Sequence, residues 1–138
     1  MSQDGSTIQP PVIRVLVANL PVSLFERVMS LAVQQPDIVL VGQVQDPVEL
    51  LMAVGSGVDV LILGAPQADP MPGICSHLLS EYPDLRILVL ASTGEAAILY
   101  WLGLRRQQLH PLSAAALLSG IRHAYSLNAT SHSSGQNV

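Results

Sequence analysis

Four short runs dominated by Val, Ile and Leu divide the chain, and they do not alternate between apolar and polar positions. The runs are Val12 to Val17, Ile38 to Val41, Val58 to Leu63 and Ile87 to Leu90. Continuous apolar runs of this length are typical of strands that are buried on both faces of a parallel sheet. The pattern therefore predicts four central strands.

The segments between these runs have helical spacing and helix-start signals. The starts are marked by Ser23 with Glu26, by Asp46 before Pro47, by Ser92 with Glu95, and by Ser113. Strands that alternate with helices favour an α/β fold with a doubly wound parallel sheet and helices on both faces. We expect five strands, the fifth being a weak one near Gln107 to Leu109.

Both ends of the chain lack apolar periodicity and are rich in Ser, Gly, Gln and Asn. We therefore expect flexible tails at residues 1–11 and 128–138 and one domain over residues 12–127. A length of 138 residues is typical of a single compact domain.

Composition and charge exclude several classes of protein and of chemistry. Hydrophobic residues make up 49% of the chain and charged residues only 12%, which is typical of a folded protein and not of a disordered one. The formal net charge is −4, so the chain has no cationic surplus to neutralise the phosphates of a nucleic acid. All six basic residues are arginines, and the absence of lysine excludes a phosphate-binding loop of the GxxxxGK[ST] type and Schiff-base chemistry.

A few other features of the sequence indicate the cellular compartment and whether a metal or cofactor is expected. The single cysteine, Cys75, cannot form an internal disulfide, which favours a reducing cytoplasm. We find no secretory signal pattern and no uninterrupted apolar stretch long enough for a membrane span. The histidines and acids lack metal-ligand spacing, so we expect neither a metal nor a cofactor.

The order and spacing of these elements resemble the receiver domain of two-component response regulators over about residues 13–127. Ile13 to Ala18 resembles the first strand of that family, Asp59 to Leu63 the third, and Arg86 to Leu90 the fourth, while His110 and Pro111 precede the last helix. The resemblance implies a flavodoxin-like (CheY-like) fold and a role in two-component-type signalling.

This sequence has other residues at all the positions that bind Mg²⁺ and the phosphoryl group in that family. A receiver uses an acidic pair for Mg²⁺, an aspartate that accepts the phosphoryl group, and a hydroxyl and a lysine that bind the phosphoryl oxygens. The matching positions here are Asn19 and Leu20, Gly64, Ala91 and His110. Without carboxylates the pocket cannot hold the Mg²⁺ that phosphoryl transfer needs. The resemblance therefore implies a pseudo-receiver without enzymatic activity.

Two residues near this pocket have a second interpretation. Asp69 follows Gly64 by five positions and could accept a phosphoryl group, although an aspartate before Pro70 is typical of a turn. His110 could bind an anion or titrate near neutral pH. Its place before Pro111 favours a structural role, with a cis peptide bond as one option.

Seven consecutive apolar residues, Ala96 to Leu102, lie where the family has a surface helix. Only one stripe of such a helix can face the core. We therefore expect an exposed partner surface made by Tyr100, Trp101, Leu104, Arg105 and Arg106. In receivers the face built from the fourth helix, the fifth strand and the last helix commonly forms dimers or binds partners.

These observations predict a noncatalytic signalling module that binds a protein partner or a second copy of itself, independently of phosphorylation. The alternative is a small-molecule sensor that uses the neutral cleft at the carboxyl ends of the strands.

Overall fold

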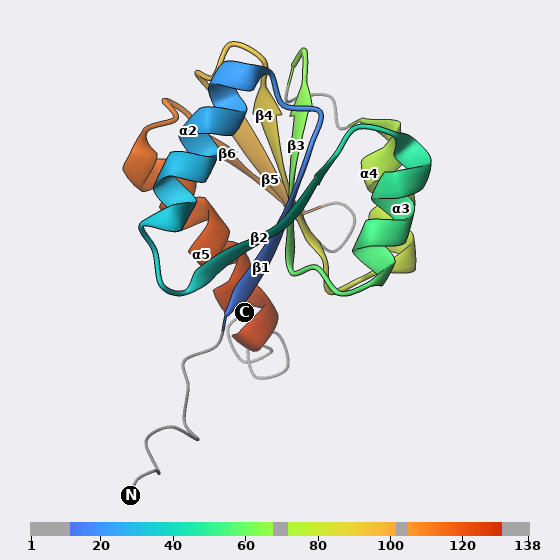
Figure 1. Ribbon diagram of the computed structural model, residues 1–138. Helices are drawn as coiled ribbons and strands as arrows, with labels where there is room; N and C mark the ends of the chain where they lie inside the picture. The colour runs from blue at the N-terminus through green and yellow to red at the C-terminus, as the bar shows by residue number, and fades with distance from the viewer. Residues whose placement is uncertain (1–11, 68–71, 102–104, 131–138) are drawn as a thin grey trace, which may run out of the picture.

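A computed structural model describes residues 12–67, 72–101 and 105–130 of the chain (Figure 1). The tail predicted at residues 1–11 lies outside these ranges, and so do residues 131–138 of the tail predicted at 128–138. Residues 128–130 of that predicted tail belong to the last helix, which extends through Thr130. The described residues form six strands, β1 (Ile13–Ala18), β2 (Ile38–Val44), β3 (Val60–Ala65), β4 (Arg86–Ala91), β5 (Ala97–Trp101) and β6 (Arg105–Leu109). Three helices connect the first four strands, α2 (Val22–Val33), α3 (Pro47–Gly55) and α4 (Gly73–Glu81), and a fourth, α5 (Ala114–Thr130), follows β6.

The strands form one mixed sheet in the order β2-β1-β3-β4-β5-β6. β1 pairs in parallel with β2 and β3, and β3 pairs in parallel with β4. β5 is antiparallel to both of its neighbours, β4 and β6. The predicted α/β class is confirmed, but the five-stranded, all-parallel arrangement is wrong.

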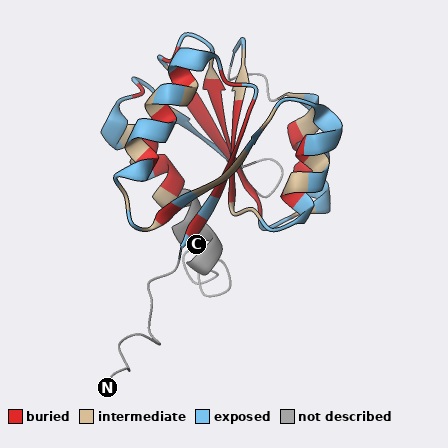
Figure 2. Ribbon diagram, in the orientation of Figure 1, coloured by how far each residue is buried: buried red, intermediate tan, exposed pale blue. Residues whose placement is uncertain are grey.

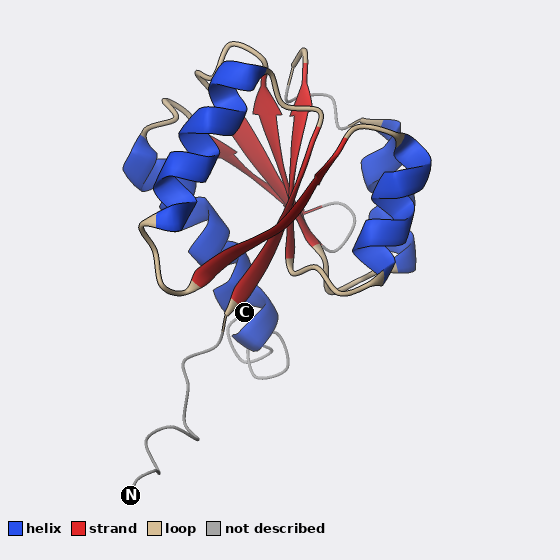
Figure 3. Ribbon diagram, in the orientation of Figure 1, coloured by secondary structure: helices blue, strands red, loops and turns tan. Residues whose placement is uncertain are grey.

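Helices cover both faces of the sheet, with α2 and α5 on one side and α3 and α4 on the other (Figures 1 and 3). The central strands have buried side chains on both faces, because successive residues of a strand point in opposite directions. Val15 and Ile62 belong to the core that contains α2 and α5 residues, while Leu16 and Leu61 belong to the core that contains α3 and α4 residues. Figure 2 shows the resulting buried centre of the sheet.

The segment from Ala96 to Leu102, which we predicted as a surface helix, contains strand β5 instead. Ile98 and Tyr100 are buried toward α3 and α4, and Leu99 is buried on the opposite face. Helices cover both faces of this sheet, so a continuous apolar run in one of its strands leaves few side chains exposed. The helix start predicted at Ser92 and Glu95 is also wrong, because both residues lie in the turn that joins β4 to β5.

Two of the predicted helix starts have capping bonds. The Asp46 carboxylate accepts hydrogen bonds from the backbone N–H groups of Val48 and Glu49, both at 3.1 Å, at the start of α3. The Ser113 hydroxyl accepts one from the N–H of Ala116 at 3.1 Å, at the start of α5. The start predicted at Ser23 is wrong, because α2 already begins at Val22 and has no side-chain cap. Among the described helices, none is both long and apolar enough to cross a membrane.

Candidate functional site at the carboxyl edge of the sheet

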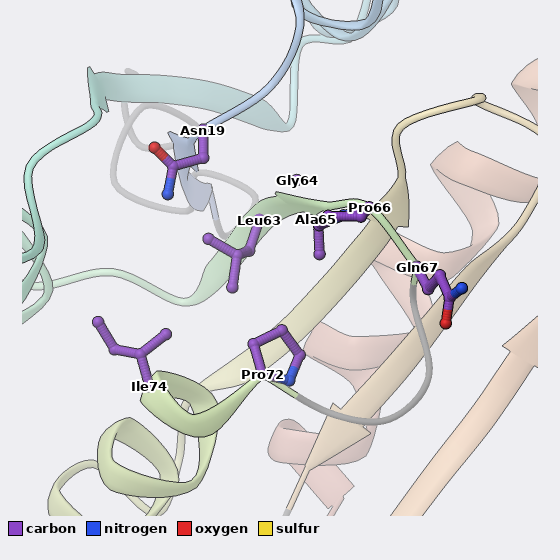
Figure 4. A pocket seen from close by; sticks show the side chains of 8 residues that line it. All are labelled: Asn19, Leu63, Gly64, Ala65, Pro66, Gln67, Pro72 and Ile74. Carbon is purple, nitrogen blue, oxygen red and sulfur yellow. The ribbon is translucent and has the colours of Figure 1, made fainter.

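A cleft of about 430 Å³ opens at the carboxyl ends of β1 and β3. Its lining is uncharged and consists of Asn19, Leu63, Gly64, Ala65, Pro66, Gln67, Pro72 and Ile74 (Figure 4). The two side-chain amides, of Asn19 and Gln67, lie at opposite ends of the lining in this view. A cleft with this lining suits a neutral, mostly apolar molecule better than a phosphate or a metal ion.

The backbone closes over Gly64, the residue that the resemblance to receivers matched to the phosphoacceptor aspartate. A Cβ atom at residue 64 would lie 2.3 Å from the backbone oxygen of Asn19 and 3.1 Å from the Cα of Leu20. Asn19 has a left-handed conformation with φ of 58°, and Leu20 is buried with 6% of its surface exposed. The loop after β1 therefore occupies the space that a carboxylate at residue 64 would need.

Ala91 lies next to this cleft and not in it. It is the register partner of Ala65 and lines a second cleft of about 480 Å³, which shares Pro66 and Gln67 with the first. The neighbouring Ser92 donates from its backbone N–H and from its hydroxyl to the carbonyl of Ala65, at 2.9 and 3.0 Å. These bonds hold the ends of β3 and β4 together, and the Ser92 hydroxyl is bonded to the backbone of β3.

His110 is separated from the other predicted pocket residues by strand β5. It follows β6, whose last residue Leu109 pairs with Ala97, and Ala97 pairs in turn with Leu90 of β4. Gly64 in β3 and His110 are thus three strand spacings apart, about 14 Å. His110 is exposed, and its bond to Pro111 is cis, the option that the sequence had left open.

The structure therefore brings together Asn19 and Gly64, places Ala91 in the adjoining cleft, buries Leu20 and leaves His110 apart. Sequence reasoning missed Gln67, Pro72 and Ile74, because no motif marks them and only the path of the chain after β3 brings them to the cleft. Asp69 lies outside the described residues. Across the part of the chain that the structure describes, no group of three or more His, Cys, Asp or Glu side chains could hold a metal ion.

The predicted partner surface is altered by the change from helix to strand. Tyr100 is only 3% exposed, so its predicted exposure is wrong. Trp101 is partly buried and packs against the core beneath α2 and α5. Arg106 is exposed on β6, where Arg105 is the first residue, and Leu104 lies outside the described residues. Because Tyr100, Trp101, Arg105 and Arg106 belong to an antiparallel strand pair, they do not form the helical face that the resemblance implied.

Three solved structures show what the chain is similar to. A structure of the response regulator RcsB from Salmonella typhimurium has a TM-score of 0.50 and 21% sequence identity, over 62% of this chain and 45% of that chain. The isolated receiver domain of RcsB from Salmonella enterica serovar Typhimurium, solved with the phosphomimetic BeF3⁻, has a TM-score of 0.48 and 21% identity, over 58% and 62%. The signal receiver domain of NarL from Mycobacterium tuberculosis has a TM-score of 0.47 and 23% identity, over 59% and 68%.

The likeness to the RcsB structure with a TM-score of 0.50 shows a receiver-type α/β fold. The chain spans 45% of that RcsB chain and 62% of the isolated RcsB receiver domain, which is less than two thirds of either. No protein-family profile matches the sequence. No curated protein matches it either.

Proposed function

We propose that this chain is a receiver-type signalling module that does not accept a phosphoryl group and acts through protein contacts. One observation carries the proposal: the backbone oxygen of Asn19 lies 2.3 Å from the position of a Cβ at residue 64. Receiver chemistry needs a carboxylate nucleophile and a Mg²⁺ site at this edge. The cleft here has a neutral lining, and His110 is separated from it by β5.

The experiment is an amide NMR titration with Mg²⁺ and beryllofluoride, which mimics an acyl phosphate. We expect no saturable shifts around Gly64. The control is Asp69→Asn, which removes the alternative acceptor that the sequence suggested. Saturable shifts in the natural sequence that disappear in Asp69→Asn would make Asp69 the acceptor and overturn the proposal.

A second candidate function is a small-molecule sensor, and the uncharged cleft of about 430 Å³ favours it. The test is a thermal-shift screen with neutral metabolites, repeated on Ile74→Trp, which fills part of the cleft. A sensor would gain stability with one compound, because a ligand that binds only the folded state raises its stability, and Ile74→Trp would lose that gain. A screen without any such compound would remove this candidate.

A further inference from the structure

A second cleft, of about 480 Å³, opens beside the first one, where the ends of β3 and β4 meet the strand pair β5–β6. Its volume lies within the range of pockets that bind small molecules. The turn that joins β4 to β5, residues 92–96, contains no helix, and no helical residue of the described chain lines the cleft. A direct turn at this connection therefore leaves a hollow at this end of the sheet.

Small or apolar side chains make up most of the lining of this second cleft. Ala91 ends β4, Ala97 begins β5, and Ala96 lies between them. The backbone N–H of Ala91 donates to the carbonyl of Ala96 at 3.0 Å, so these two backbone groups are already bonded to each other. Pro66 and Ile98 complete the apolar part. A flat ring can lie against such a surface without leaving a polar group of the protein unsatisfied.

The rest of the lining consists of three uncharged polar side chains, those of Gln67, Thr93 and Gln108. Each glutamine amide offers an acceptor oxygen and two donor hydrogens. Within the described residues, neither of these two amides has a hydrogen-bond partner in the protein. The Thr93 hydroxyl accepts a hydrogen bond from the N–H of Glu95 at 3.4 Å, which leaves its own hydrogen to donate. The described lining therefore offers donors and acceptors but no charge.

The two amides reach the cleft from opposite sides. Gln67 follows β3 and Gln108 lies in β6, with β4 and β5 between them, so their backbones are three strand spacings apart, about 14 Å. Figure 4 shows the Gln67 side chain pointing away from Leu63 and Ile74 of the first cleft. Gln108 is the register partner of Ile98, so both side chains lie on the same face of the sheet. A ligand in this cleft lies between the two amides.

We propose that this second cleft binds a neutral planar molecule with an amide edge, that is, an N–H group beside a carbonyl in one plane. Nucleobases and carboxamides have such edges. A glutamine amide pairs with an adjacent donor and acceptor through two hydrogen bonds, as it does with the edge of a base. The alanine methyl groups contact the ring. A charged molecule of the same shape is disfavoured, because the described lining holds no cation to compensate for its desolvation.

This inference goes beyond the proposed protein contacts and concerns a different cleft from that of the sensor candidate, so it stands or fails separately from both. The test is an NMR titration with uracil and, separately, with nicotinamide, which follows the backbone amides and the side-chain NH₂ groups of Gln67 and Gln108. Two matched probes lack the amide edge. Uracil methylated on both ring nitrogens has no N–H group, and nicotinate has a carboxylate in place of the carboxamide.

We expect saturable shifts of both side-chain NH₂ groups with at least one of the two ligands, and binding of its matched probe that is weaker by at least about tenfold. Binding of uracil alone would identify nucleobases as the ligand class, and binding of nicotinamide alone would identify carboxamides. The proposal is overturned if neither ligand gives saturable shifts up to its limit of solubility. Equal binding of a ligand and its matched probe would also overturn it, because the amide edge would then not be recognised.

Two neighbouring glutamines of β6 provide matched variants, Gln108→Met and Gln107→Met. Both positions are exposed, but successive residues of a strand point to opposite faces, and Gln108 alone of the two lines the cleft. We expect the dissociation constant to rise by at least about tenfold in Gln108→Met and to stay unchanged in Gln107→Met and in Ile74→Trp. Equal effects of the two glutamine variants would contradict the proposed site. Binding that is lost in Ile74→Trp and kept in Gln108→Met would place the ligand in the first cleft and overturn the proposal.

Discussion

Gly64 allows the loop after β1 to close over the end of β3, because it has no side chain. The loop residue Asn19 and Gly64 are far apart in the sequence, and only the parallel pairing of β1 with β3 brings them together. The glycine therefore has two consequences. It leaves this position without a side chain that could accept a phosphoryl group, and it permits a backbone contact that any side chain would prevent.

We predict that Gly64→Ala lowers the free energy of unfolding by about 1–3 kcal/mol, since the added methyl group forces the backbone at Asn19 to move. Urea unfolding followed by circular dichroism measures this change. The control is Gly73→Ala at the start of α4, where an added Cβ has nothing within 4 Å. Equal losses in both variants would show that the contact with Asn19 is unimportant.

The thiol of Cys75 is the only one in the chain, and it is buried in the core beneath α3 and α4. Burial raises its pKa to about 12, so the reactive thiolate is scarce at neutral pH. Iodoacetamide should therefore modify the folded protein far more slowly than the urea-unfolded protein, as followed by intact mass. Comparable rates in the two states would contradict the burial of this residue.

At the scale of elements, β5 is the main departure from the predicted structure. An apolar run of seven residues has the same composition in a buried strand and in a helix, so composition alone cannot separate them. The deciding interactions are with β4 and β6, which lie on both sides of β5 in the sheet. Gly94, with φ of 78°, lies in the turn that makes β5 antiparallel to β4.

We predict that Tyr100→Ala lowers the free energy of unfolding by about 3 kcal/mol or more, because Tyr100 is buried in a core and its loss leaves a cavity. Gln107→Ala, at an exposed position of β6, should change it by less than about 0.5 kcal/mol. Fluorescence of the single tryptophan can follow both unfolding curves. A small effect at Tyr100 would support the exposed helix that the sequence predicted.

The start of α3 illustrates a local signal that the structure confirms. Asp46→Ala should cost about 1 kcal/mol, because the N–H groups of Val48 and Glu49 lose their acceptor. Asp46→Asn keeps a side-chain oxygen and should cost less. Thermal unfolding of the three proteins tests this order, and an equal loss in both variants would point to the charge instead of the cap.

At the scale of the whole molecule, an ion pair connects α5 to the loop before β2. Arg122 donates to both carboxylate oxygens of Asp37 at 2.9 Å and to the side chain of Gln35 at 2.6 Å. The hydrogen bond from Arg122 is the main reason that the pKa of Asp37 is lowered. The pair is partly exposed, so its contribution to stability should be below about 1 kcal/mol.

The sign of the pH dependence follows from that lowered pKa. The pair stabilises the fold above the pKa of an unfolded aspartate, about 3.9, and this contribution is lost as the pH falls through the lower pKa of the folded state. Asp37→Asn should therefore be less stable than the natural sequence near neutral pH, and the difference should shrink in acid. Urea unfolding at a series of pH values measures it. If the difference in unfolding free energy between the two proteins stayed the same at every pH, the ion pair would not be the cause of the pH dependence.

The sequence by itself determined the four parallel strands, the cap of α3, the absence of lysine, and the lack of charge at Asn19, Leu20, Gly64 and Ala91. These are properties of local patterns or of residue identity. The tertiary structure alone decided that Ala97–Trp101 is a strand, that the backbone of Asn19 fills the space beside Gly64, and that His110 lies beyond β5. Each of these depends on which distant segments pair, and a backbone can satisfy its hydrogen bonds locally in a helix or across strands in a sheet.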